Sequence, residues 1–234
     1  GNKGSTFYAY ADSAAFNQFL SYNINFEPVE DYYNTSKALT MATSVAQMAN
    51  WDRYPTHSVY VQMMQNYAVN YPNLCYLDTI GYSENGYPLL MLVISDNPGT
   101  DEDEPEFLWT NTMHGDELAC YPISLRFIDY LLSNYGTDTQ ITNLINLSEL
   151  YINPLANPDG TFNGSPGTSV SNSIRYNSDG LDLNRNFPRI DGNSTTISTE
   201  IQAMIDLANQ RDFVMSANSH GGAELLNYPW DEWT

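Results

Sequence analysis

Histidine is rare in this sequence, and two of its three histidines fall where a buried strand is expected to end. His114 follows residues 107–113, and His220 follows residues 213–219. Glu117 comes shortly after His114, so both side chains can point to one side of a strand-to-helix turn. Two imidazoles and one carboxylate are a ligand set typical of catalytic zinc, whose open fourth position activates water against a carbonyl. We therefore expect a zinc site with one Zn²⁺ per chain.

Two arginines form the second chemically informative feature, because Lys and Arg together number only 8. Arg175 and Arg185 flank a segment rich in Gly, Asn and Asp, and Asn184 stands beside the second arginine. A guanidinium matches a carboxylate with two parallel hydrogen bonds, and an amide adds a neutral donor. The alternative is surface pairing with the chain's many carboxylates. We accept that alternative for Arg189 and Arg211, and we favour carboxylate recognition for Arg185.

Alternating strand and helix patterns predict the elements that position these side chains. Strands that alternate with helices favour an α/β fold with a mixed, doubly wound sheet flanked by helices. In such sheets ligands gather outside the carboxyl ends of the strands, where His114 and His220 are expected to lie. The expected strands are 74–80, 89–94, 107–112, 150–153 and 213–217, and the expected helices are 56–71, 122–133 and 199–209.

The helix expected over residues 122–133 is amphipathic. Its apolar residues recur at the spacing that places them on one face, as in a helix that covers a core. We expect this face to pack inward on the sheet; it comprises Ile123, Phe127, Ile128, Leu131 and Leu132.

Composition excludes several classes of protein. Eight Lys and Arg against 28 Asp and Glu give a formal net charge of -20, so no basic surface is expected to neutralise nucleic-acid phosphates. No stretch approaches the roughly 18 apolar residues that a membrane-spanning helix needs. The 42% hydrophobic content suffices for one sizeable core, which excludes wholesale disorder.

The cysteines and the N-terminal region carry less information. Cys75 and Cys120 are the only cysteines, too few for a disulfide framework or a multi-thiolate zinc site, and whether they pair stays open. Residues 1–50 differ in character from the rest, with a strand expected at 7–10. We expect them to be an N-terminal appendage of unknown role, followed by an α/β domain over 51–234.

Five motifs in the α/β domain resemble those of a known family, the zinc metallocarboxypeptidases of the carboxypeptidase A/B type. The resemblance is strongest to the regulatory branch that includes carboxypeptidases D, E, M and N. Order and approximate spacing agree from about Trp51 to the end. The matching runs are Thr-Met-His-Gly-Asp-Glu at 112–117, Asn-Pro-Asp-Gly at 157–160, Leu-Asp-Leu-Asn-Arg-Asn-Phe-Pro at 181–188, Thr199-Glu200, and His-Gly-Gly-Ala with the later Asn-Tyr-Pro-Trp-Asp at 220–231.

The resemblance implies a zinc-dependent hydrolase that acts on the C-terminal peptide bond. His114, Glu117 and His220 would be the zinc ligands, in agreement with the interpretation above. Arg175 fits the arginine that polarises the scissile carbonyl and stabilises the oxyanion, where one preorganised donor is worth on the order of 3 kcal/mol. The expected fold is therefore that of a metallocarboxypeptidase catalytic domain.

The resemblance also implies the substrate class. Asn184 and Arg185 would hold the free C-terminal carboxylate of a peptide or protein substrate. Asp231 matches an acidic residue that binds a basic side chain in the regulatory branch, which favours C-terminal Lys or Arg. The family and the acidic, lysine-poor composition suggest an extracellular or periplasmic location.

One departure from the family concerns the C-terminal part of the domain. The family's general-base glutamate and a substrate-closing tyrosine lie several tens of residues beyond the third zinc ligand, whereas this chain ends at Thr234. We expect both residues to be absent, with a loss of ~10²–10⁴-fold in rate for the missing base. We favour a part of a longer or nicked protein; a second chain that completes the fold, or a naturally shortened relative, are the alternatives.

Three other functions remain open from the sequence. The first is a peptidase that cuts the D-glutamyl–diaminopimelate bond of bacterial cell walls, against which Asp231 counts mildly. The second is a non-catalytic, zinc-stabilised module that binds peptide tails. The third is a structural surface protein with a relict fold, which predicts no stoichiometric zinc.

Overall fold

The computed structural model describes residues 13–27, 39–100, 102–189, 196–222 and 225–228, and the chain forms two compact units, residues 1–38 and 39–234. In the smaller unit, the rings of Phe16 and Phe19 on helix α1 (Ser13–Leu20) contact that of Phe26. The strand expected at 7–10 lies outside the described residues. Residues 39–50, which we expected in the N-terminal appendage, belong to the larger unit.

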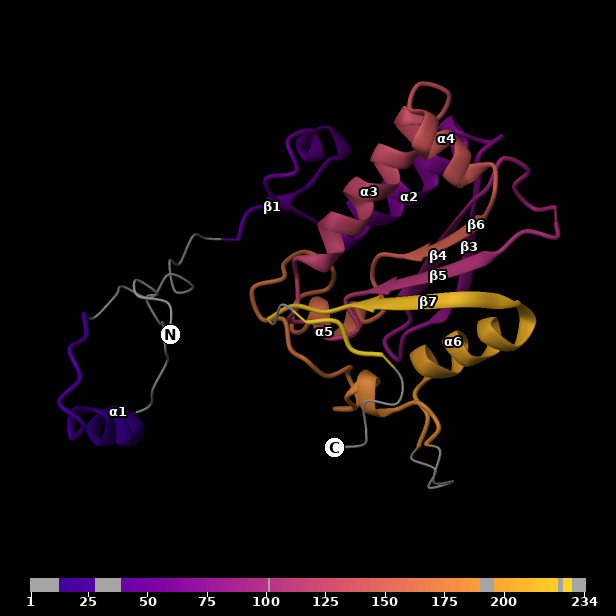
Figure 1. Cartoon of the computed structure of the whole chain (residues 1–234). Coiled ribbons are helices and arrows are strands. Elements are labelled where there is room, and N and C mark those ends of the chain that lie inside the picture. Colours follow the sequence, from indigo (N-terminus) through magenta and orange to yellow (C-terminus); the bar gives the residue numbers. More distant parts are fainter. Residues whose placement is uncertain (1–12, 28–38, 101, 190–195, 223–224, 229–234) are drawn as a thin grey trace. The chain divides into compact units, whose positions relative to one another are not determined.

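The larger unit is built on a five-stranded mixed sheet with the order β3-β4-β6-β5-β7 (Figure 1). Strands β3 (Cys75–Tyr82) and β4 (Pro88–Ile94) form an antiparallel hairpin, and β4 also pairs antiparallel with β6 (Glu149–Asn153). Strands β6, β5 (Glu106–Asn111) and β7 (Phe213–Ser219) run parallel. The expected α/β fold with a mixed, helix-flanked sheet is confirmed.

Helices cover both faces of this sheet (Figure 1). Helices α2 (His57–Asn70), α3 (Cys120–Asn134) and α4 (Thr139–Ile145) supply one side of the core, and α6 (Thr199–Gln210) packs on the other. Side chains from Thr56, Asp138 and Ser198 cap α2, α4 and α6 by accepting backbone N–H bonds, which satisfies donors that a helix start leaves free. The remaining short elements are β1 (Met41–Ala42), β2 (Tyr54–Pro55), α5 (Pro158–Thr161) and the 3₁₀ turns η1 (Val45–Met48) and η2 (Leu183–Arg185).

The two-residue alternation of the central strands divides the core between these layers. Leu92 of β4 joins Ile152 of β6 in the cluster under α2 and α3, whereas Met91 and Val93 face Leu207 of α6. Most of the strand residues on both faces are fully buried, as expected for the centre of a doubly covered sheet.

The inward face expected for α3 is partly wrong. Its residues Ile128, Leu131 and Leu132 are buried, but Ile123 is 57% exposed and Phe127 is 37% exposed. Phe127 packs edge-on against Trp109 of β5, whose indole N–H bonds Ser219 of the edge strand β7. Strand β7 is itself exposed along most of its length, so within the described residues this side of α3 has no covering layer.

Both cysteines are buried free thiols in the larger unit. Burial raises the pKa of Cys75 to about 12, so this thiol stays protonated at neutral pH. None of the helices in the described ranges combines the length and the apolarity required to cross a bilayer.

Candidate metal centre

The two strand-end histidines meet because β5 and β7 are neighbouring parallel strands. The register pairs Asn111, the last residue of β5, with Ser219, the last residue of β7. His220 follows β7 directly, and His114 lies in the turn after β5, so both imidazoles reach the carboxyl edge of the sheet. Their Nδ1 atoms lie 3.1 Å apart.

Glu117 completes a three-membered cluster with these histidines. Its Oε1 lies 2.9 Å from Nδ1 of His114, and its Oε2 lies 2.9 Å from Nδ1 of His220. Ligands about 2.0–2.1 Å from a tetrahedral zinc ion are roughly 3.3 Å from one another. Two imidazole nitrogens and a carboxylate have the chemistry of a zinc ligand set, and the separations between nitrogens and from each nitrogen to a carboxylate oxygen approach those of neighbouring zinc ligands, so the residues fit the metal that the sequence predicts.

The backbone between β5 and Glu117 is unusual in two ways. Thr112 adopts a left-handed conformation with φ of 56°, which costs a non-glycine residue roughly 1–2 kcal/mol. At Gly115, a Cβ would overlap the backbone of Gly160 and Thr161. The glycine in this motif is thus required by close packing against the Asn-Pro-Asp-Gly turn, rather than by a positive φ.

Asn157 joins the turn that carries His114 to the segment that carries Arg175. Its side chain is completely buried, and its Nδ2 donates to the carbonyl oxygens of Met113 (3.1 Å) and Arg175 (3.2 Å). Its Oδ1 accepts the Gly160 N–H at 2.8 Å. The first residue of the Asn-Pro-Asp-Gly motif is therefore a rigid link behind the metal centre.

Asp182 is a site residue that the sequence did not single out. Its Oδ1 lies 3.1 Å from Nε2 of His114, and its Oδ2 accepts a hydrogen bond from Nε of Arg175 at 2.9 Å. A carboxylate on the far ring nitrogen fixes the imidazole tautomer that leaves Nδ1 free for a metal. Burial raises the pKa of Asp182, but the hydrogen bonds from Arg175 and His114 outweigh it and hold that pKa below the ordinary value.

Glu117 is held in the ionised form that a metal ligand needs. Burial raises its pKa, yet the Gly221 N–H at 2.9 Å and the two imidazoles together lower the pKa below the usual glutamate value. A backbone donor thus fixes the carboxylate between the two histidines.

The remaining sequence-predicted residues lie at different distances from the cluster. Nη1 of Arg175 is 3.2 Å from Nδ1 of His114, and Nδ2 of Asn184 is 3.4 Å from Nε2 of His220. The guanidinium of Arg185 donates to the backbone oxygen of its neighbour Asn184 at 2.9 Å and has no hydrogen bond to the three cluster residues. Asp231 lies outside the described residues.

His57, the third histidine, has a different environment. Its ring packs against those of Tyr87 and Phe162, with centroids 4.5 and 5.8 Å away. Burial lowers its pKa to about 4, so it is neutral near neutral pH. This packing agrees with its interpretation as a structural residue.

The model of the zinc carboxypeptidase family matches residues 60–234. The chain belongs to the zinc carboxypeptidase family. Carboxypeptidase D of mouse is 38% identical over 171 residues, which cover 72% of this chain and 12% of that protein. Carboxypeptidase M of mouse is 39% identical over 172 residues, which cover 72% of this chain and 38% of that protein. The resemblance to the branch that includes carboxypeptidases D, M and N is thus confirmed, over less than half the length of these relatives.

Solved structures place the larger unit in the same fold. Carboxypeptidase A from Helicoverpa armigera aligns with a TM-score of 0.65 and 24% identity, covering 78% of this chain and 49% of that one. Thrombin activatable fibrinolysis inhibitor aligns with a TM-score of 0.59 and 21% identity, covering 75% of this chain and 49% of that one. The chain therefore spans about half of each of these two structures.

Proposed function

We propose that this chain carries the zinc-binding and substrate-anchoring part of a carboxypeptidase that releases C-terminal residues from peptides or proteins. One zinc ion would be held by His114, Glu117 and His220. The observation that carries the proposal is the convergence of two imidazole nitrogens and a carboxylate within 2.9–3.1 Å of one another at the carboxyl ends of β5 and β7.

Zinc in such an open site supplies Lewis acidity toward a carbonyl and activates water. Arg175 is placed to donate N–H groups to the carbonyl oxygen of the scissile bond, because its guanidinium already borders the donor atoms of His114 and Glu117. Asp182 holds the Nε side of that guanidinium, which leaves the terminal nitrogens to face substrate. Preorganised positive charge at this point favours the oxyanion over the ground-state carbonyl.

Asn184 and Arg185 would anchor the substrate's terminal carboxylate. They lie in η2 beside His220, and a fork of N–H donors matches a carboxylate geometrically. Anchoring the carboxylate next to the metal places the last peptide bond, and no internal bond, at the zinc. Selection of a free C-terminus follows from this arrangement.

A preference for C-terminal Lys or Arg is part of the proposal. It is supported by the Asp231 motif and by the identity to carboxypeptidases D and M, and the formal net charge of -20 would attract cationic peptides at low salt. An extracellular or periplasmic location belongs to the same proposal, on the grounds of family and acidic composition.

A second candidate function is binding of peptide tails without turnover. It is favoured because the carboxylates around the cluster already have hydrogen-bond partners. Glu117 faces both histidines, and Asp182 is engaged by Arg175 and His114. Among the described residues, no other carboxylate has a hydrogen bond or ion pair to the three cluster residues. Hydrolysis therefore needs a proton acceptor other than the carboxylates of the described residues.

The two candidates are separated by incubating the chain, with one equivalent of zinc, with a peptide that ends in Arg. Mass spectrometry detects loss of the last residue, and isothermal titration measures binding of the free acid and of its C-terminal amide. Zinc-dependent release of Arg supports the carboxypeptidase, and tight binding of the free acid alone supports the binding module. Equal binding of acid and amide, without release, contradicts both.

Arg185→Met tests the proposed anchor, and Arg189→Met is the matched control. Arg185→Met should weaken binding of the peptide with a free C-terminal carboxylate and leave binding of the C-terminal amide unchanged. The control removes an arginine of the same region that lies outside the Asn-Arg-Asn run and should change neither.

A further inference from the structure

Two buried carboxylates outside the cluster hold the segment that carries Arg175 and Asp182. Glu200 is 1% exposed and Asp159 is 4% exposed. They belong to the Thr-Glu and Asn-Pro-Asp-Gly motifs, and the proposed function assigns a role to neither. Their hydrogen bonds converge on two consecutive residues, Asn177 and Ser178.

Glu200 binds the buried side chain of Asn177. Its Oε2 accepts a hydrogen bond from Nδ2 of Asn177 at 3.1 Å, and its Oε1 accepts from the backbone N–H of Glu84 at 3.4 Å. Oδ1 of Asn177 in turn accepts the backbone N–H groups of Asp179 (3.1 Å) and Leu181 (2.9 Å). This turn leads directly into Asp182, so the position of Asn177 determines the position of the Asp182 backbone.

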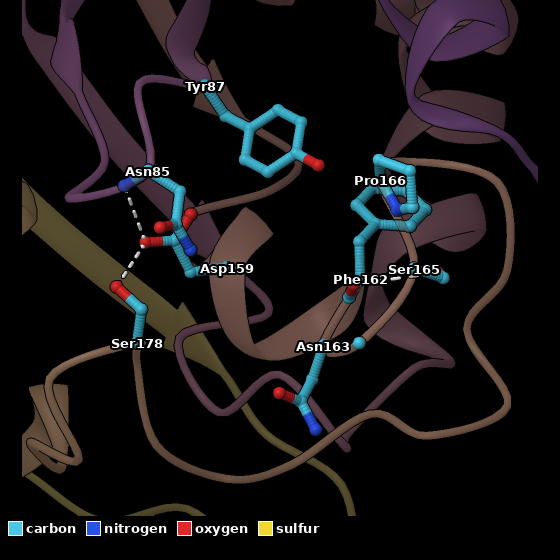
Figure 2. A pocket seen from close by; sticks show the side chains of 9 residues that line it. Asn85, Tyr87, Asp159, Phe162, Asn163, Ser165, Pro166 and Ser178 are labelled. Carbon is cyan, nitrogen blue, oxygen red and sulfur yellow. Dashed lines mark hydrogen bonds between the residues drawn. The ribbon is translucent and has the colours of Figure 1, made fainter.

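Asp159 binds the next residue along, as Figure 2 shows. Its Oδ2 accepts from Oγ of Ser178 at 2.9 Å and from the backbone N–H of Asn85 at 3.0 Å, and its Oδ1 accepts from Oγ of Ser83 at 2.6 Å. The carboxylate lines a cavity of about 280 Å³, which Tyr87 also lines. Both carboxylates thus fasten residues 177–178 to the turn between β3 and β4.

We propose that Glu200 and Asp159 are positioning residues for the metal centre. By fixing Asn177 and Ser178 they set the place of Asp182, and through it the orientation of the His114 imidazole and of the Arg175 guanidinium. The inference rests on the proposed zinc site. It adds a support for the segment from Arg175 to Asp182, made by side chains that do not contact the three proposed zinc ligands.

The test compares Glu200→Gln, Asn177→Ala and the double variant in the full chain. A glutamine offers one acceptor oxygen to two donors, so it cannot satisfy both Asn177 and Glu84. The matched control is Glu84→Gln: this side chain accepts from the Thr199 N–H at 3.1 Å and has no hydrogen bond to residues 177–178. Zinc dissociation constants come from chelator competition, and the visible spectrum of the Co²⁺-loaded protein reports the ligand geometry.

Each single variant should bind zinc roughly tenfold more weakly, as expected for loss of support behind a ligand, and should shift the Co²⁺ spectrum. The double variant should be no weaker than either single variant, because both remove the same link. Glu84→Gln should match the wild type. On the Asp159 side, Ser178→Ala removes an exposed hydroxyl and should weaken zinc binding by a few-fold.

A merely structural role would lower the stability of the zinc-free protein and leave the zinc affinity and Co²⁺ spectrum of the folded protein unchanged. That result in Glu200→Gln and Asn177→Ala would overturn the inference while the zinc site stands. If these variants do not fold, wild-type affinity and spectrum in Ser178→Ala would overturn it. If the wild type binds no zinc, the proposed function fails first.

Discussion

The two ends of the parallel strands both carry carboxylates, yet they are organised in opposite ways. At the carboxyl ends of β5 and β7, atoms that can bind a metal face one another: two Nδ1 atoms and the Glu117 carboxylate lie within 2.9–3.1 Å. At the amino ends of β5 and β6, Glu106 and Glu149 each face donors. Ligand atoms that converge on one another can hold a cation, whereas carboxylates that face donors form a closed structural network.

The closed network centres on Tyr151. Its hydroxyl lies 2.8 Å from Oε2 of Glu149 and 3.3 Å from Oε1 of Glu106. The Asp212 N–H donates to Oε2 of Glu106 at 2.9 Å, and the Arg211 guanidinium lies over the Tyr151 ring. Arg211, which we expected to pair on the surface, pairs with the buried Glu106 instead, at 3.7 Å from Nη1 to Oε1. This end therefore contributes to stability without a metal.

The largest effect is expected from His220→Ala. Loss of one of three ligands should weaken zinc binding beyond the roughly 10–100-fold that loss of an outer partner costs, so stoichiometric zinc should disappear in equilibrium dialysis with metal analysis. Glu106→Gln, at the opposite end, should keep one zinc per chain. Retention of wild-type zinc affinity by His220→Ala would break the contrast between the two ends.

Asp182→Asn should weaken zinc binding by ~10–100-fold. The asparagine amide lacks the negative charge that the Asp182 carboxylate presents to His114 and Arg175. The His114 imidazole therefore loses the charged partner that fixes its tautomer. Glu149→Gln is the control from the closed network. Chelator competition measures both, and equal affinities in the two variants would show that Asp182 does not act on the ligand.

Tyr151→Phe should lower the free energy of unfolding by ~1–3 kcal/mol, because it removes the hydroxyl donor that lies within reach of two buried carboxylates. Urea denaturation measures this change. The zinc dissociation constant should remain that of the wild type, and a joint loss of stability and affinity would mean that the two ends are coupled.

The smallest effect concerns pH. Burial raises the pKa of Glu106 above the ordinary value of 4.5, and Arg211 and the Asp212 N–H only partly offset it. The folded state therefore holds this proton longer than the unfolded state, and stability falls as pH rises from 4.5 through the higher folded pKa. Glu106→Gln should reduce the fall in the free energy of unfolding over this pH range. An unchanged slope would mean that another group causes the fall.

The sequence predicted the central sheet because its strands are short apolar runs bounded by turn residues. It also predicted the meeting of His114 and His220, because the carboxyl ends of parallel strands share an edge. It missed α4 (Thr139–Ile145), a two-turn helix too short and too polar to show a periodic apolar face. The inward orientation of Ile123 and Phe127 was wrong because periodicity identifies an apolar stripe, but not which neighbour covers it.

Asp182 shows a second limit of the sequence. It stands in the same run as Asn184 and Arg185, but its contact with His114 joins residues 68 positions apart. The path of the segment from Arg175 to Asp182 depends on buried bonds from Asn157, Asp159 and Glu200, which no local pattern specifies. The signal for Asp182 is its carboxylate within the run that contains Asn184 and Arg185, because metal-binding histidines commonly donate to a carboxylate.

X-ray absorption at the zinc edge, on the chain loaded with one equivalent of zinc, tests the central claim most directly. The account predicts one bound zinc with two imidazoles and one carboxylate, and loss of one imidazole in His220→Ala. Sulfur scattering from Cys75 or Cys120, three imidazoles including His57, or the absence of stoichiometric zinc would contradict it.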